Sequence, residues 1–130
     1  MSTLKVNTLQ DASGNNPSTT AQLNKGRAKA WVNFDATSSG TNKTLRGSYN
    51  VDSVTDINTG RFAINFTTGA LADANYCFSG SVANDNSTMV TFTGLQGDGD
   101  YSTSILDIRV ITSGNSEVDR FVTCITVHGN

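Results

Sequence analysis

The chain of 130 residues contains one Pro, one His, one Trp and two Cys, and only 15% of its residues are charged. A chain this poor in Glu and Lys does not match the composition of coiled coils or helical bundles. Its 11 acidic residues outnumber its 9 Lys and Arg, so we expect no nucleic acid as a partner. No stretch approaches the roughly 20 apolar residues of a membrane span, so we expect no membrane insertion.

The same scarcity leaves little material for catalysis or metal binding. The single histidine, His128, lies near the end of the sequence, and one His cannot build a conventional zinc site. Asp98 and Asp100 flank Gly99 as in some calcium loops, but the twelve-residue EF-hand pattern is absent. We therefore predict that the chain is not an enzyme and has no catalytic residue, cofactor or metal.

The cysteines and the start of the chain bear on where it folds. Cys77 and Cys124 form no C-x-x-C motif. The first ten residues lack the apolar core of a secretory signal. We expect a chain folded in a cytoplasm, with two free, half-buried thiols rather than a disulfide between strands.

Ser, Thr, Asn and Gly are abundant, at 58 of the 130 residues. They separate short runs in which apolar and polar residues alternate, the signature of half-buried strands. The clearest run is residues 61–68, with Phe62, Ile64 and Phe66 on one face. Further runs lie at residues 28–34, 48–55, 76–82, 90–92, 104–112 and 121–127. About seven to eight such strands predict an all-β, jelly-roll-like antiparallel sandwich over residues 28–130.

Residues 1–27 have a different pattern and form an N-terminal extension. Asn16 followed by Pro17 is typical of a helix start, and Gly26 of a helix end, so we expect a short helix or an irregular connector. Two hypotheses remain for the apolar residues before it. They belong either to a docking arm that adds a strand to a partner's sheet edge, or to the first strand of the domain's own sheet.

The strands at residues 104–112 and 121–127 are apolar on both faces. The core face of the last strand is predicted to comprise Phe121, Thr123, Ile125 and Val127. A two-layer sandwich buries one face of each sheet, so residues on the other face, such as Ile105 and Ile111, indicate another covered surface. The cover that we expect is a second copy of the chain.

Trp31 lies on the strand face opposite Ala30, Val32 and Phe34. Two functions fit a large aromatic residue there. It packs against a neighbouring sheet or subunit, or it offers a stacking platform to a sugar. We favour packing, because one lone Trp is a weak carbohydrate signal and aromatic residues are common at interfaces.

Four segments carry a resemblance to a known family. They are MSTLKVNTLQDASGNN at residues 1–16, GRAKAWVNF at 26–34, SYNVDSVTD at 48–56, and the run from RFAINFTT to ADANY at 61–76. Taken in this order, they resemble small virion proteins of tailed phages, notably marine and cyanobacterial ones. The resemblance covers residues 1–78, and the remainder matches only in its strand rhythm.

The resemblance implies a non-enzymatic tail fibre, knob or capsid decoration protein, a homotrimer located on the virion and assembled in the host cytoplasm. Its partners would be its own copies, other virion proteins, and a host surface glycan or receptor. A free-standing carbohydrate-binding module is the alternative. The residues expected at the anchor or between subunits are Leu4, Val6, Leu9, Trp31, Ile105 and Ile111.

Overall fold

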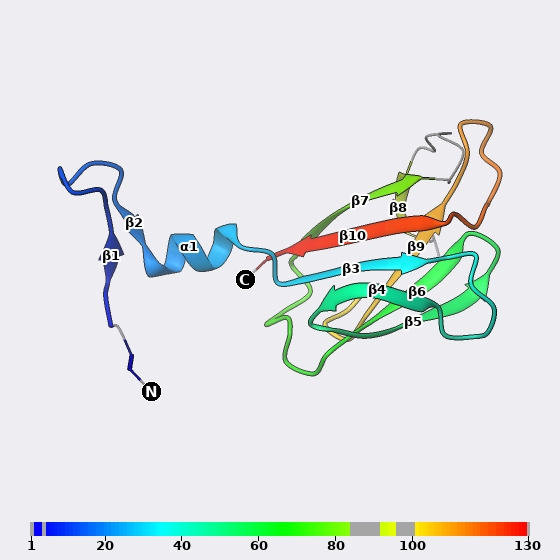
Figure 1. Cartoon of the computed structure of the whole chain (residues 1–130), viewed down its shortest axis with the longest axis horizontal. Helices are drawn as coiled ribbons and strands as arrows, with labels where there is room; N and C mark the ends of the chain where they lie inside the picture. Colours follow the sequence, from blue (N-terminus) through cyan, green and yellow to red (C-terminus); the bar gives the residue numbers. More distant parts are fainter. Residues whose placement is uncertain (1, 4, 84–91, 96–100, 130) are drawn as a thin grey trace.

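In the computed structural model, which describes residues 2–3, 5–83, 92–95 and 101–129, two antiparallel four-stranded sheets pack face to face (Figure 1). The predicted all-β sandwich is confirmed. The front sheet has the order β4 (Thr44–Tyr49), β3 (Ala30–Asp35), β10 (Val122–His128), β7 (Cys77–Ala83). The back sheet has the order β5 (Val51–Asn58), β6 (Arg61–Phe66), β9 (Ile105–Val110), β8 (Phe92–Leu95).

The chain wraps around the core by changing sheets repeatedly. It crosses from one sheet to the other between β4 and β5, β6 and β7, β7 and β8, and β9 and β10. Such crossings are the feature that the fold shares with a jelly roll, whereas β3–β4 and β5–β6 pair as neighbours within one sheet. The predicted contribution of Val90 to a core strand lies outside the described residues.

The core lies between the sheets and follows the alternation expected from the sequence. Phe34 of the front sheet and Phe62 of the back sheet meet edge to face, with ring centroids 5.2 Å apart. The alternate residues of β6 and β9 are buried, because successive side chains of a strand point to opposite faces. The buried members of these two strands are Phe62, Ile64, Phe66, Leu106, Ile108 and Val110.

The strand predicted at residues 48–55 is in fact two strands in different sheets. β4 ends at Tyr49 and β5 begins at Val51, while Asn50 between them has φ +55°. Asn tolerates this left-handed conformation better than most residues, which lets the chain turn from one sheet to the other. Its side-chain amide donates to Lys29 O at 2.7 Å. The edge strand β4 escaped prediction because it lacks a regular apolar alternation.

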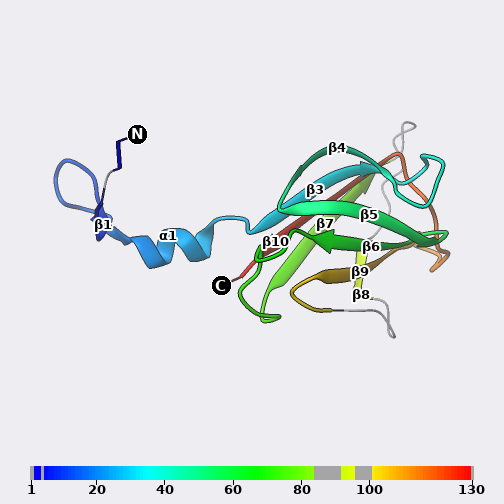
Figure 2. The ribbon, with the colours of Figure 1, turned by 90° about the horizontal axis from the view of Figure 1, so that it is seen from below.

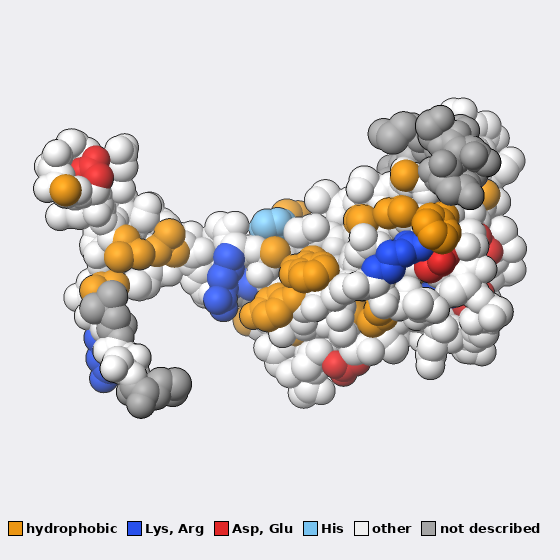
Figure 3. Space-filling view, in the orientation of Figure 1, with side chains coloured by type: hydrophobic (Ala, Val, Ile, Leu, Met, Phe, Trp, Pro, Cys, Tyr) orange, Lys and Arg blue, Asp and Glu red, His pale blue; other side chains and the backbone are white. Residues whose placement is uncertain are grey.

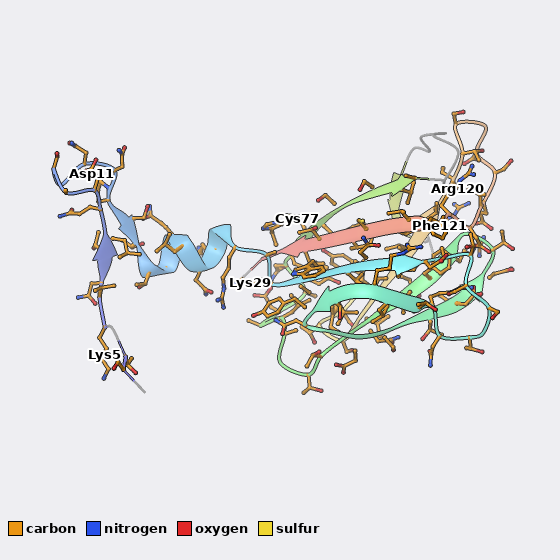
Figure 4. All side chains as sticks on the ribbon, viewed as in Figure 1. Lys5, Asp11, Lys29, Cys77, Arg120 and Phe121 are labelled. Carbon is orange, nitrogen blue, oxygen red and sulfur yellow. The ribbon has the colours of Figure 1, made fainter. Side chains whose placement is uncertain are left out.

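The prediction that Phe121 lies on the core face of the last strand is wrong. The strand begins one residue later, and the Phe121 side chain is 42% exposed (labelled in Figure 4). The guanidinium of Arg46 stacks on its ring at 4.1 Å and donates to the carbonyl oxygens of Phe34 and Phe121. This contact with Arg46 holds the ring outside the sandwich core.

The N-terminal residues form a separate small unit. β1 (Thr8–Leu9) pairs with β2 (Ser18–Thr19), and α1 (Thr20–Gly26) follows. The predicted helix start at Asn16 and Pro17 is wrong. Pairing with β1 keeps the chain extended through Thr19, and Thr19 caps the helix by accepting from Gln22 N while the Gln22 side chain accepts from Thr19 N. The predicted end of the helix at Gly26 is correct.

We call residues 2–26 the arm and residues 27–29, which join it to β3, the neck. β1 pairs with β2 alone, in a sheet of its own, so the hypothesis that the N-terminal apolar segment is a strand of the sandwich is wrong. The arm extends away from the sandwich in both views (Figures 1 and 2). Every described arm residue is exposed except Ser18, which is half-buried.

Candidate interaction surfaces

The outer face of the front sheet is uncharged over most of its area and carries two solvent-exposed aromatic rings. Trp31 and Tyr49 are cross-strand partners on β3 and β4, and their side chains are 41% and 45% exposed. Figure 3 shows hydrophobic side chains on the molecular surface over this part of the sheet. Residues that are directly paired on neighbouring strands share a face of the sheet. Two rows of such residues cross all four strands here. The first row is Tyr49, Trp31, Thr126 and Ser79, and the second is Gly47, Asn33, Cys124 and Ser81.

Trp31 packs against Gly47 of the neighbouring strand. A Cβ placed on Gly47 would come within 3.3 Å of the indole atoms Cζ3 and Cη2. The six-membered ring therefore lies close to the bare backbone of Gly47, and part of the side chain is left to solvent. Such an arrangement suits either a neighbouring protein surface or a flat ligand, because aromatic rings bury a large apolar area at low entropic cost.

The outer face of the back sheet is polar, and its side chains are bonded to one another. Glu117 Oε1 pairs with Arg61 Nε at 2.7 Å and with Arg109 Nη2 at 2.9 Å. Asn65 Nδ2 donates to Ser53 Oγ at 3.0 Å and to Thr55 Oγ1 at 2.9 Å. Covering this face would require these groups to leave water, so it is the less favourable of the two faces for a protein contact.

The Glu117 carboxylate is also the clearest electrostatic feature of that face. The hydrogen bond from Arg61, followed by the charges of Arg61 and Arg109, holds the pKa of Glu117 below its ordinary value, against a smaller opposing effect of burial. The pairing joins the loop before β10 to β6 and β9. It is therefore a structural link rather than a catalytic group.

The structure separates the six residues that the sequence suggested for anchoring or subunit contact. Trp31 lies on the uncharged outer face of the front sheet, whereas Ile105 lies half-buried beside Asn65 on the polar face of the back sheet. Ile111 is only 9% exposed and bridges to Glu117, so its own chain already covers it. Its predicted role between subunits therefore has no support. Leu4 lies outside the described residues.

The remaining two predicted residues, Val6 and Leu9, lie on the arm. Their side chains are 37% and 48% exposed, and Leu23 of α1 is 43% exposed. No residue of α1 is buried. The arm thus presents apolar side chains without a hydrophobic core of its own, and covering them is favourable by about 25 cal/mol for each Å² removed from water.

The two cysteines are free, as predicted; Cys124 is half-buried, but Cys77 is exposed, so the prediction that both are half-buried is wrong for Cys77. Both lie on the adjacent strands β7 and β10, but Cys77 is opposite His128 and Cys124 is opposite Ser81. A separation of four residues along a strand is about 13 Å. Because a disulfide needs Cα atoms within about 7 Å, this register does not allow one.

Sites for chemistry are scarce in the described part of the chain. Within it, no three His, Cys, Asp or Glu side chains gather closely enough to hold a metal ion. Nor does any helix among the described residues have the length and apolar character needed to cross a membrane. The Asp98–Asp100 pattern lies outside the described residues.

A stacked pair, Tyr76 and Tyr101, closes one end of the sandwich, with ring centroids 4.4 Å apart.

The tyrosine pair is built into the fold. Tyr76 OH donates to Ser102 O at 3.1 Å, and Tyr101 OH donates to Tyr76 O. Burial, with a contribution from Tyr101, raises the pKa of Tyr76 above its ordinary value. Burial also raises the pKa of Tyr101, and both phenols act as hydrogen-bond donors that tie the loop before β7 to the loop before β9.

The sequence does not show the environments of two residues. Alternation along the run 48–55 places Tyr49 and Val51 on one face, but the change of sheet at Asn50 leaves Tyr49 exposed and Val51 buried. A lysine is ordinarily solvated, but Lys29 is buried in the neck. The pattern Tyr-Asn-Val carried one signal, since Asn often marks a turn between strands.

Comparison of this chain with protein-family models, with curated proteins and with solved structures finds no match.

Proposed function

We propose that this chain is a non-enzymatic structural protein of a tailed-phage particle, displayed at the particle surface as a homotrimer and attached through its N-terminal arm. The observation that carries the proposal is the arm itself. Residues 2–26 extend from the sandwich, and all but Ser18 among the described ones are exposed. A segment of this kind contributes little to the stability of its own chain and is suited to contact another protein.

The apolar residues of the arm supply the energy of attachment. Val6, Leu9 and Leu23 are each more than one-third exposed in the isolated chain. Fully burying a Val or Leu side chain contributes about 1.5–3 kcal/mol, of which the exposed fraction remains to be gained on docking. The backbone of the two-stranded sheet β1–β2 adds hydrogen bonds if it pairs with the edge of a partner's sheet.

The outer face of the front sheet serves the contact between copies in this proposal. Its central positions are uncharged, and it carries the exposed rings of Trp31 and Tyr49. Depletion of charge and enrichment in aromatic residues distinguish the centre of protein interfaces from other surfaces. The paired charges of the back sheet, in contrast, stay in contact with water and face outward.

A carbohydrate-binding module is the second candidate, and one observation favours it. The Trp31 indole packs against Gly47 beside Tyr49, and the same face carries the hydroxyl of Thr126 and the amide of Asn33. In that case the chain would act as a monomer, and a saccharide would quench the Trp31 fluorescence. Mutation of Trp31 would then abolish saccharide binding without changing the oligomeric state.

The experiment that tests the proposal uses particles of the phage that encodes this sequence. Mass spectrometry of purified particles should detect the chain, and cryo-electron microscopy should place its copies at the tail or over the capsid. Copies at many symmetric capsid positions indicate a decoration protein, whereas copies at the tail indicate a fibre or knob that contacts a host glycan or receptor. A chain that is abundant in infected cells but never found on particles would contradict the proposal.

A deletion separates attachment from folding. Removal of residues 2–16 should abolish binding to particles that lack the protein, while the melting temperature of the sandwich stays close to that of the full chain. The variant Ile57→Glu is the control, because Ile57 is 51% exposed on the back sheet, away from the arm. It should bind particles like the unaltered chain.

A further inference from the structure

A cleft of about 240 Å³ opens where the arm meets the sandwich. Its lining includes Asn24 of α1, Arg27 and Lys29 of the neck, and Tyr49, Asn50 and Ala70 of the sandwich. Figure 4 labels Lys29 at this junction, and Figure 3 shows blue side chains between α1 and the sandwich. The lining residues include two cations and no acidic residue.

Lys29 is the unusual member of this lining. The residue is only 6% exposed, and among the described residues its ammonium has a single hydrogen-bond partner, Asn24 Oδ1, at 2.9 Å. An ammonium group offers three donors and carries a full charge. Burial of a charge is costly unless an opposite charge and further hydrogen bonds compensate it.

Lys43 is buried to a similar extent, but its ammonium has a carboxylate partner. It is 7% exposed, and its ammonium pairs with Asp56 Oδ2 at 2.7 Å and donates to Ser38 O at 2.9 Å. In the described part of the chain, the other ion pairs engage Arg46, Arg61 and Arg109. Lys29 is thus a buried cation whose carboxylate partner is missing from the described residues.

Arg27 adds a second cation beside the first. It ends α1 with an extended backbone, at φ −83° and ψ 150°, and no described carboxylate lies within 4.0 Å of its guanidinium. Arg27 and Lys29 line the same cleft, so one small anion bound there can contact both cations.

We propose that this cleft binds a carboxylate, which completes the missing ion pair of Lys29 and makes a second contact with Arg27. Guanidinium and ammonium groups form their strongest hydrogen bonds with ionised acceptors. Ala70 and Tyr49 offer apolar surface to the short carbon chain that carries the carboxylate. A phosphate fits less well, because the described lining meets α1 at its C-terminal end and so offers no helix N-terminus to satisfy the additional oxygens.

This binding site is independent of the proposed virion function. A bound carboxylate would join α1 to the sandwich through Asn24, Arg27 and Lys29, and so would fix the direction in which the arm leaves the neck. The carboxylate comes either from an Asp or Glu side chain of a partner protein or from a free small acid. The chemistry of the site is the same in both cases.

The test is a titration of the ¹⁵N-labelled full chain with sodium acetate, followed by nuclear magnetic resonance, with sodium chloride at matched ionic strength as the reference. We expect acetate to shift the backbone amide signals of Asn24, Lys29 and Asn50 along a saturating curve. Lys29→Met keeps the length of the side chain and removes the charge, and should weaken binding about tenfold or more. Arg27→Gln, at an exposed position, should weaken it several-fold. Lys5→Met on the arm is the matched control and should leave binding unchanged.

Two further ligands distinguish the source of the carboxylate. Tighter binding of a blocked Gly-Asp-Gly peptide than of acetate or succinate indicates a protein side chain, and the reverse order indicates a free acid. The proposal is overturned if acetate shifts follow those of chloride, if Lys29→Met binds acetate as well as the unaltered chain does, or if phosphate binds more tightly than every carboxylate. An unchanged dispersion of the remaining signals shows that each variant is folded.

Discussion

Gly60 packs directly against the backbone of Val118, with no space for a side chain between them. A Cβ on Gly60 would lie 2.6 Å from Val118 N and 2.7 Å from Val110 O. Gly60 also has φ +67°, a conformation that residues with a Cβ rarely adopt. The turn between β5 and β6 is thereby held against the segment that leads into β10.

We expect Gly60→Ala to lower the free energy of unfolding by at least about 2 kcal/mol, through backbone strain and a clash with fixed backbone atoms. Gly69→Ala is the matched control. Gly69 has φ +79°, but nothing lies within 4 Å of a Cβ placed there, so it should cost only about 1 kcal/mol. Urea unfolding measures both losses, and equal losses would contradict the close contact with Val118.

Thr123 is fully buried in β10, and its hydroxyl Oγ1 has no hydrogen-bond partner among the described residues. Thr123→Val replaces the hydroxyl by a methyl group of similar size. We expect the free energy of unfolding to rise by about 1 kcal/mol, because the unpaired polar group is removed without a cavity. Thermal unfolding followed by circular dichroism measures the change. A less stable variant would show that the hydroxyl is satisfied, for example by a buried water.

The pairing of Glu117 with Arg61 and Arg109 makes stability depend on pH. The pKa of Glu117 is lower in the folded chain than its ordinary value of 4.5. A carboxyl with a lowered folded pKa stabilises the fold above its unfolded pKa, and this contribution disappears as the pH falls through the folded pKa. The fold should therefore lose stability as the pH falls below about 4.5.

Glu117→Gln isolates this contribution. The variant should be less stable than the unaltered chain at pH 7, and the difference should be smaller at pH 3, because acid favours the uncharged form of Glu117. Urea midpoints at the two pH values provide the measurement. A difference that stays constant with pH would mean that the effect of the substitution is one of packing and not of charge.

Trp31 tests the role of the front sheet. Trp31→Glu places a charge in the centre of the exposed aromatic face and should convert the expected trimer to monomers, because a buried unpaired charge opposes association. Ile57→Glu introduces the same charged side chain on the back sheet and should leave the trimer intact. Sedimentation velocity at micromolar concentration separates the species. An unaltered chain that sediments as a monomer would exclude self-association, and the aromatic face would then need another partner.

The amino-acid pattern alone determined the fold class and most of the core. Alternation of Phe62, Ile64 and Phe66, and of Leu106, Ile108 and Val110, was sufficient because burying one face of each strand is the dominant favourable term in forming a sandwich. The end of α1 at Gly26 was also local information. The true helix start was not, because the pairing of β1 with β2 keeps the chain extended through Thr19.

Only the tertiary structure decided which surfaces are left to meet a partner. Ile105 and Ile111 have the same residue type and the same strand face in the sequence, yet the loop that carries Glu117 covers Ile111. Tyr49 reached the surface because Asn50 redirects the chain between sheets. Lys29 became a buried cation because α1 and the sandwich close around the neck. Exposure depends on contacts between segments far apart in the sequence, and those contacts are set by the packing of the whole chain.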